Sequence, residues 1–95
     1  MSDAQRVAIV TGGSRGIGRQ VVQQLAEEGY ALVVNYAGNR ADADATMAAL
    51  AGLGARAIAF QADVADENAV AAMFDAAERE FGGVDVVVNM AGIMP

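Results

Sequence analysis

Several residue types on which enzymes and metalloproteins commonly depend are missing from this 95-residue chain. It has no cysteine, which excludes disulfides, thiolate metal sites and cysteine nucleophiles. It has no histidine, so imidazole-based catalysis and most transition-metal sites are excluded as well. Lysine is also absent, because all six basic residues are arginines dispersed along the chain. The chain therefore offers no thiol, imidazole or amine side chain for catalysis.

Positive charge is scarce too. The formal net charge of −6 argues against nucleic acid or an anionic membrane surface as a partner. No apolar run approaches the length that spans a bilayer, and residues 1–6 lack the apolar segment of a signal peptide. We therefore expect a cytoplasmic protein with no nucleic-acid and no membrane partner.

Short apolar runs alternate with longer amphipathic ones, in a composition (55% apolar, 19% charged) typical of one small globular domain. The predicted strands are Arg6–Thr11, Ala31–Tyr36, Arg56–Gln61 and Val84–Asn89. The predicted helices are Gly16–Glu28, Ala41–Leu53 and a third that Asp66 caps and Gly82-Gly83 ends. Crossovers of helical length between strands imply parallel pairing with right-handed connections. The expected fold class is α/β, a Rossmann-type doubly wound parallel sheet.

Two of these helices carry apolar residues at helical spacing, which predicts the faces that pack on the sheet. In the first helix these residues are Ile17, Val21 and Leu25, and in the third they are Val70, Phe74, Ala77 and Phe81. We interpret the second set as core and not as a binding site. The last strand, with Val86–Val88, is typical of a sheet interior and requires neighbours on both sides. Either a partner chain covers it, or the sequence is the N-terminal part of a longer one.

The segment Thr11–Gly18 carries the most information about function. Gly12 allows a tight turn at the end of the first strand, Gly16 lets a pyrophosphate approach the helix N-terminus, and Gly18 allows close helix–strand packing. Such a turn presents backbone N–H groups and the positive end of the helix dipole to phosphate. The segment therefore predicts a dinucleotide site, although a glycine turn that merely links strand to helix is the structural alternative.

The spacing Thr-Gly-x-x-x-Gly-x-Gly resembles the short-chain dehydrogenase/reductase family in its compact form with one Rossmann-type domain. Asp63-Val64 follows the third strand, where that family places an aspartate near the adenine, and Asn89-Met90-Ala91-Gly92 stands where it carries Asn-Asn-Ala-Gly. Residues 15–19 are similar to those of 3-oxoacyl-acyl-carrier-protein reductases. The resemblance runs from Arg6 to Pro95. Met90 departs from the pattern, as tolerated variation or as altered function.

The resemblance implies a set of cofactor-binding residues. They are Gly12, Ser14, Arg15, Gly16, Ile17, Gly18, Asn35, Tyr36, Asp63, Val64, Asn89, Ala91 and Gly92. In this interpretation the Asp63 carboxylate accepts from the adenine amino group and Val64 supplies a backbone contact, although Asp63 could instead cap its own turn. Asn89, Ala91 and Gly92 line the ribose, and the Asn89 side chain ties neighbouring strands together.

The end of the second strand bears on the choice of nicotinamide cofactor. Sheets that bind NAD commonly place a carboxylate there, which accepts from the ribose 2′-OH and would repel a 2′-phosphate. Tyr36 occupies that position in register with the family, and no carboxylate follows before Arg40. Arg15 can pair with the 2′-phosphate, with Arg40 as a weaker second candidate. We therefore predict NADP(H) over NAD(H), although Arg15 could be a solvated loop arginine.

The resemblance also implies the chemistry, which is hydride transfer to or from a carbonyl/alcohol carbon of a small-molecule substrate. Its Ser, Tyr and Lys lie beyond the fourth strand in family members, and this chain has no Lys and only Tyr30 and Tyr36. We therefore expect residues 1–95 to be the cofactor-binding N-terminal part of a single Rossmann-type domain, inactive alone, within a homo-oligomeric oxidoreductase. The alternatives are a non-catalytic dinucleotide-binding module complete as given, and a Rossmann-like domain for another adenine ligand, such as a methyl donor.

Overall fold

The computed structural model describes residues 5–12 and 16–90, and in that part of the chain strands and helices alternate as predicted. The elements are β1 (Val7–Thr11), α1 (Gly16–Glu27), β2 (Ala31–Tyr36), α2 (Arg40–Gly52), β3 (Ala57–Gln61), α3 (Glu67–Phe81) and β4 (Val86–Asn89). Their ends differ from the sequence-based ranges by at most two residues, which is the normal uncertainty of such boundaries.

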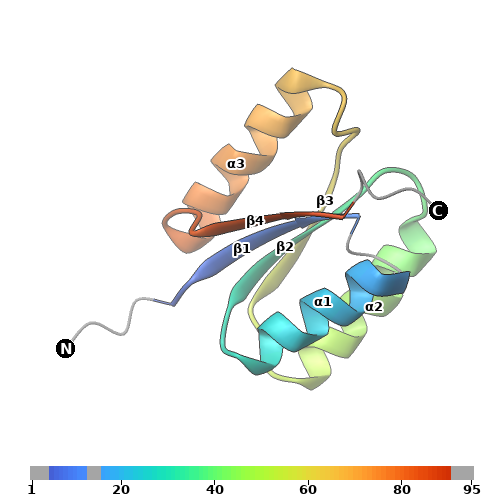
Figure 1. Ribbon diagram of the computed structural model, residues 1–95, viewed down its shortest axis with the longest axis vertical. Coiled ribbons are helices and arrows are strands. Elements are labelled where there is room, and N and C mark those ends of the chain that lie inside the picture. Colours follow the sequence, from blue (N-terminus) through green and yellow to red (C-terminus); the bar gives the residue numbers. More distant parts are fainter. Residues whose placement is uncertain (1–4, 13–15, 91–95) are drawn as a thin grey trace.

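The four strands form one parallel sheet in the order β3-β2-β1-β4. Ile9 at the centre of β1 lies between Val33 of β2 and Val87 of β4. Helices α1 and α2 cover one face of the sheet and α3 covers the other (Figure 1). The chain leaves β1 in one direction, toward β2, and later returns to its other side as β4. This reversal creates a topological switch point at the carboxyl ends of β1 and β4, where α/β sheets bind their ligands.

The core has two layers because successive side chains of a strand point to opposite faces. On the face of α1 and α2, the buried cluster is Ala8, Val10, Val22, Leu32, Val34 and Leu50. On the face of α3, it is Ile9, Val33, Met73 and Ala77. Strands β1 and β2 are buried along their whole length, as expected for the interior of a parallel sheet.

The packed faces of the helices agree only in part with those predicted, although Val21 and Leu25 of α1 do pack against the first cluster. In α1 the buried residues are Gly18 and Val22, whereas Ile17 is 63% exposed. Each helical residue turns by about 100° from the one before, so a face centred on Gly18 and Val22 leaves Ile17 outside it. Placing Ile17 in the core-facing stripe was therefore wrong.

In α3 the residues that reach the core are Met73, Ala76 and Ala77. Phe74 and Phe81 are half-buried and pack against the second cluster from its margin. The expectation that the Val70/Phe74/Phe81 stripe is core is thus only partly right. Val70 and Phe74 instead line an apolar hollow beside β4, because no element among the described residues covers that flank.

The caps that the sequence predicts for α3 are present. The Asp66 side chain accepts hydrogen bonds from the backbone N–H groups of Asn68 and Ala69. Gly82 ends the helix in the left-handed conformation at φ 89°, which favours glycine. These ends fix where the chain leaves the β3–α3 loop and where it enters β4.

Strand β4 lies at the edge of the sheet. Among the described residues it pairs only with β1, and Val87 is 48% exposed. The prediction of neighbours on both sides is therefore not met within this part of the chain. In the described residues no helix is long and apolar enough to cross a membrane.

Candidate functional site

The carboxyl edge of the sheet gathers most of the described residues that the sequence assigns to a cofactor. Gly12 follows β1 with φ +67°, and Gly16 begins α1 with φ +63°, so both adopt a conformation that L side chains rarely take. A Cβ built on Gly16 would meet no atom of the described residues within 4 Å. Ser14 and Arg15 lie outside the described residues. The glycines thus leave room for a ligand at the start of α1.

The first turn of α1 contains no acidic residue, so nothing in it offsets the positive end of the helix dipole. Gly18 is buried on the sheet side of the helix and Ile17 is exposed on its outer side. The first turn of α2 differs, because it carries Asp42 and the side chain of Asn39 already accepts from the backbone N–H of Asp42. Of these two helix N-termini on the same face of the sheet, that of α1 is the one suited to an anion.

The end of β2 is buried. Asn35 is 2% exposed and Tyr36 is 7% exposed, so neither side chain is open to solvent. Both polar atoms of the Asn35 amide form hydrogen bonds within the protein. The backbone carbonyl of Tyr36 accepts a hydrogen bond of 3.0 Å from the backbone N–H of Ala62. No carboxylate stands between β2 and α2, and Arg40 lies 3.9 Å from Asp44 on the exposed surface of α2. An exposed pair of this kind contributes little to stability.

The loop between β3 and α3 holds Asp63 and Val64. The Asp63 carboxylate accepts from the backbone N–H of Ala65 at 2.9 Å, so Asp63 does cap its own turn. That bond occupies Oδ1, and no group among the described residues donates to Oδ2. Capping and ligand binding are therefore compatible at this exposed carboxylate.

Val64 is 41% exposed and contributes to the apolar hollow beside β4, which has a volume of about 190 Å³. Thr11 and Asn89 line the same hollow from the ends of β1 and β4. The hollow therefore adjoins the topological switch point. It connects the β3–α3 loop with the strand ends on the α3 side of the sheet.

Asn89 is tied to β1, as the sequence analysis expects. Its Oδ1 accepts a hydrogen bond of 2.9 Å from the Thr11 hydroxyl, and the two residues are in register across β1 and β4. The backbone N–H of Met90 continues the pairing, at 3.1 Å from the carbonyl of Thr11. No role for Thr11 was predicted from the sequence. The feature that could have indicated one is its position, because Thr11 directly precedes Gly12 and ends the strand that pairs with the strand of Asn89.

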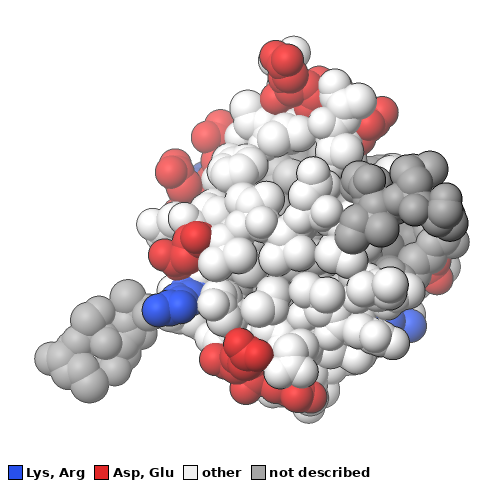
Figure 2. All heavy atoms as spheres, viewed as in Figure 1, with Lys and Arg blue, Asp and Glu red and all other residues white. Residues whose placement is uncertain are grey.

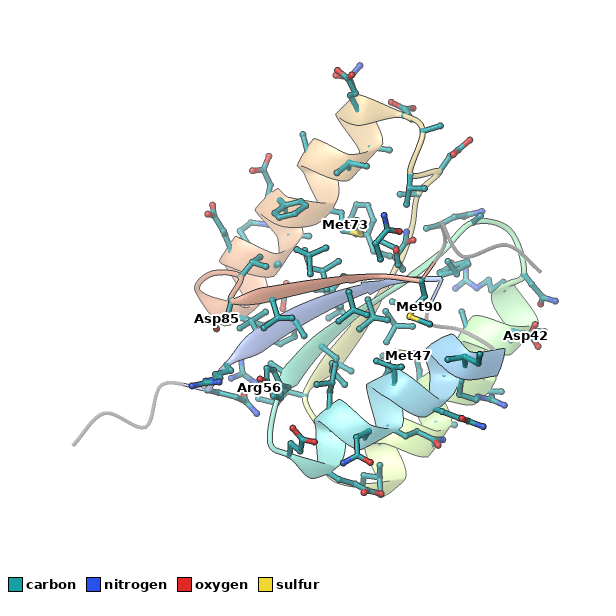
Figure 3. All side chains as sticks on the ribbon, viewed as in Figure 1. Asp42, Met47, Arg56, Met73, Asp85 and Met90 are labelled. Atoms are coloured by element: carbon teal, nitrogen blue, oxygen red, sulfur yellow. The ribbon has the colours of Figure 1, made fainter. Side chains whose placement is uncertain are left out.

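Met90 departs from the polar pattern and lies on the α1 side of the sheet. Its side chain is half-buried and packs against the first core cluster, on the α1 side of the sheet (Figure 3). The thioether therefore completes an apolar surface beside α1. Ala91 and Gly92, which the sequence analysis assigns to the ribose, lie outside the described residues.

The opposite edge of the sheet is held together by its own polar groups. The Arg56 guanidinium lies 5.0 Å from the centroid of the Phe81 ring and donates to Gln5 and to the carbonyl of Glu80. A hydrogen bond with Tyr30 raises the pKa of the Arg6 guanidinium above its ordinary value. These contacts connect neighbouring strands and helices, and they indicate a structural role for Arg6 and Arg56.

Comparison with known proteins matches the chain to the short chain dehydrogenase family over residues 6–95. It is 50% identical over 86 residues to the 3-oxoacyl-acyl-carrier-protein reductase FabG of Staphylococcus aureus, covering 90% of this chain and 35% of that protein. The chain thus spans about a third of the length of this curated relative.

Solved structures agree. A dehydrogenase/reductase from Sinorhizobium meliloti superposes with a TM-score of 0.89 at 39% identity, over 97% of this chain and 36% of that one. A dehydrogenase from Burkholderia cenocepacia with bound NADP gives 0.83 at 35% identity, over 90% and 34%. The glycine turn, the parallel sheet and the Thr11–Asn89 pair therefore occur in a chain that belongs to the short-chain dehydrogenase/reductase family of oxidoreductases.

Proposed function

We propose that residues 1–95 form the cofactor-binding part of an NADP(H)-dependent oxidoreductase that interconverts a carbonyl and an alcohol by hydride transfer. The observation that carries this is the glycine turn at the carboxyl end of β1. It leads into an α1 N-terminus without acidic residues, beside Asn89 at the switch point. In an α/β sheet this is the position for a dinucleotide pyrophosphate.

The preference for NADP(H) is supported by the end of β2. Tyr36, Ala37, Gly38 and Asn39 provide no carboxylate that would accept from a 2′-hydroxyl or repel a 2′-phosphate. The Burkholderia cenocepacia relative carries NADP. We assign the 2′-phosphate to Arg15, because Arg40 has an acidic neighbour in Asp44.

The other parts of the cofactor are assigned to further residues of the site. Gly12, Gly16 and Ile17 offer backbone groups to the pyrophosphate, and Gly18 keeps α1 close to the sheet. Asp63 offers its second carboxylate oxygen to the adenine amino group, and Val64 supplies a backbone contact. A cofactor held in this way supplies the hydride for the reduction. We assign Ala91 and Gly92 to the ribose.

No residue of the chain is assigned a catalytic role. Tyr36 is buried at the end of β2, and Tyr30 is bonded to Arg6 at the opposite edge of the sheet, so neither tyrosine can reach a substrate at the switch point. We place the Ser, Tyr and Lys of the reaction outside residues 1–95 and expect the 95 residues alone to be inactive.

The surface over β4 supports the interpretation of residues 1–95 as the N-terminal part of a single Rossmann-type domain. Acidic side chains gather over α3 and over the helices on the other face, whereas the surface between them is largely uncharged (Figure 2). The half-exposed Val87 lies on this edge strand. An uncharged sheet edge is suited to burial by further polypeptide. We further propose a cytoplasmic homo-oligomer.

The test is a titration of the longest native polypeptide that contains this sequence with NADPH and with NADH. We expect enhanced NADPH fluorescence on binding, and a dissociation constant for NADPH below that for NADH by about tenfold or more, because a paired 2′-phosphate adds a charge-assisted interaction. Tighter binding of NADH overturns the cofactor assignment. Binding of neither, with S-adenosylmethionine bound instead, overturns the oxidoreductase assignment.

A further inference from the structure

Asn35 joins three segments at the carboxyl edge of the sheet. Its Oδ1 lies 3.4 Å from the backbone nitrogen of Gly12, which donates to it. Its Nδ2 donates to the carbonyl of Phe60 at 3.2 Å and to the carbonyl of Ala62 at 3.1 Å. One side chain thus contacts the start of the glycine turn, the end of β3 and the beginning of the β3–α3 loop.

The hydrogen bonds explain why an amide stands at this position. Asparagine is unfavourable in a buried strand, and Asn35 follows the fully buried Val33 and Val34. The site requires one acceptor and two donors, a combination that only a side-chain amide provides. Aspartate would present oxygens to two carbonyls, and a hydroxyl could donate only once. The amide is therefore matched to the three groups that it contacts.

The segments that Asn35 connects belong to different parts of the proposed cofactor site. Gly12 opens the turn assigned to the pyrophosphate. Ala62 directly precedes Asp63, which is assigned to the adenine, and its backbone N–H is also bonded to the carbonyl of Tyr36. Because Asn35 is 2% exposed, its side chain has no surface to offer a ligand.

We propose that Asn35 is a positioning residue, which sets the spacing between the pyrophosphate turn and the adenine loop without contacting the cofactor. This role rests on the proposed function. A dinucleotide that engages both segments at once benefits from their fixed separation, as a bivalent ligand does. A fragment that engages only the adenine loop gains nothing from that separation.

The test compares two ligands on variants of the longest native polypeptide that contains this sequence. Asn35→Asp keeps the size and removes both donors, and Asn35→Ser removes the amide without adding charge. We expect the dissociation constant for NADPH to rise by about tenfold, the effect of losing a buried hydrogen bond. The dissociation constant for adenosine, which lacks both the pyrophosphate and the 2′-phosphate assigned to Arg15, should change by less than about twofold, because the bond from the Ala62 N–H to the Tyr36 carbonyl still holds the adenine loop.

Asp85→Ala is the matched control. The Asp85 carboxylate accepts from the backbone N–H of Val7 at 2.8 Å, at the amino ends of the strands and away from both segments. Loss of this hydrogen bond should lower the unfolding temperature while leaving the dissociation constants for both ligands unchanged. Thermal unfolding of each variant shows that it is folded, and Asn35→Ser serves if Asn35→Asp does not fold.

The outcomes separate this role from the proposed function. An equal loss for NADPH and adenosine, or no loss for either, overturns the positioning role alone. Failure of the unsubstituted polypeptide to bind NADPH overturns the proposed function, and this role with it. A loss confined to NADPH supports the role, since a general weakening of the fold would affect both ligands.

Discussion

Thr11 and Asn89 face each other across β1 and β4, and the Thr11 hydroxyl donates a hydrogen bond of 2.9 Å to the side-chain oxygen of Asn89. This bond joins the two strand ends that flank the switch point. It also orients the Asn89 amide, because Oδ1 is the atom bonded to Thr11. The Asn89 amide nitrogen has no partner among the described residues.

The first prediction concerns the stability that this bond provides. Thr11→Val keeps the shape of the side chain and removes the hydroxyl, so we expect the free energy of unfolding to fall by about 1 to 2 kcal/mol. Thr11→Ser retains the hydroxyl and should lose less. Urea unfolding followed by circular dichroism measures both. Equal stability of the valine variant and the parent would show that the bond contributes nothing.

A second prediction separates two exposed glycines. Gly16 has φ +63° at the start of α1, whereas Gly52 lies in the last turn of α2 without a positive φ. A Cβ on either would meet no atom within 4 Å in the part of the chain that the structure describes. Gly16→Ala should destabilise by about 1 kcal/mol through backbone strain. It should also weaken NADPH binding by placing a methyl group where the pyrophosphate approaches.

The matched variant Gly52→Ala should be neutral or stabilising by up to about 1 kcal/mol, because alanine favours the helix. Its NADPH affinity should equal that of the parent. Thermal unfolding and fluorescence titration of both variants check this pair. The interpretation of Gly16 fails if the two glycines respond alike.

How far the sequence determines the site depends on the range of the interaction. Local rules were sufficient for Asp66 as a helix cap and for the glycine turn, because both depend on residues within a few positions. The parallel pairing of the strands followed from the alternation of elements. Asp63 shows both outcomes, since its turn-capping bond is local, whereas its proposed ligand contact depends on another molecule.

Contacts between residues far apart in the chain could not be predicted from the sequence. Nothing in the run Val33–Tyr36 indicates that the Asn35 amide reaches Gly12 and Ala62, because the chain segments meet only when the sheet forms. The packed face of α1 was misjudged for a related reason. Periodicity identifies an apolar stripe, but the position of the sheet decides that Val22 faces inward and Ile17 does not.

A third prediction tests the choice between NADP(H) and NAD(H). Arg15→Ala removes the charge assigned to the 2′-phosphate, so we expect NADPH binding to weaken by about tenfold while NADH binding stays within about twofold. Arg79→Ala is the control with the same change in net charge, since Arg79 lies in the last turn of α3. Equal weakening of both dinucleotides by Arg15→Ala would assign Arg15 to the pyrophosphate or to the fold.

The last prediction concerns the exposed edge of the sheet. Val87 is 48% exposed in the described residues, and further polypeptide is proposed to cover it. If it is covered, Val87→Lys in the longest native polypeptide buries a charge and should reduce the free energy of unfolding by about 3 kcal/mol or more. The same substitution in the 95-residue chain alone should cost less than about 1 kcal/mol, because the lysine can reach solvent. Urea unfolding of the two forms gives the comparison, and an equally small cost in both would mean that this edge stays open.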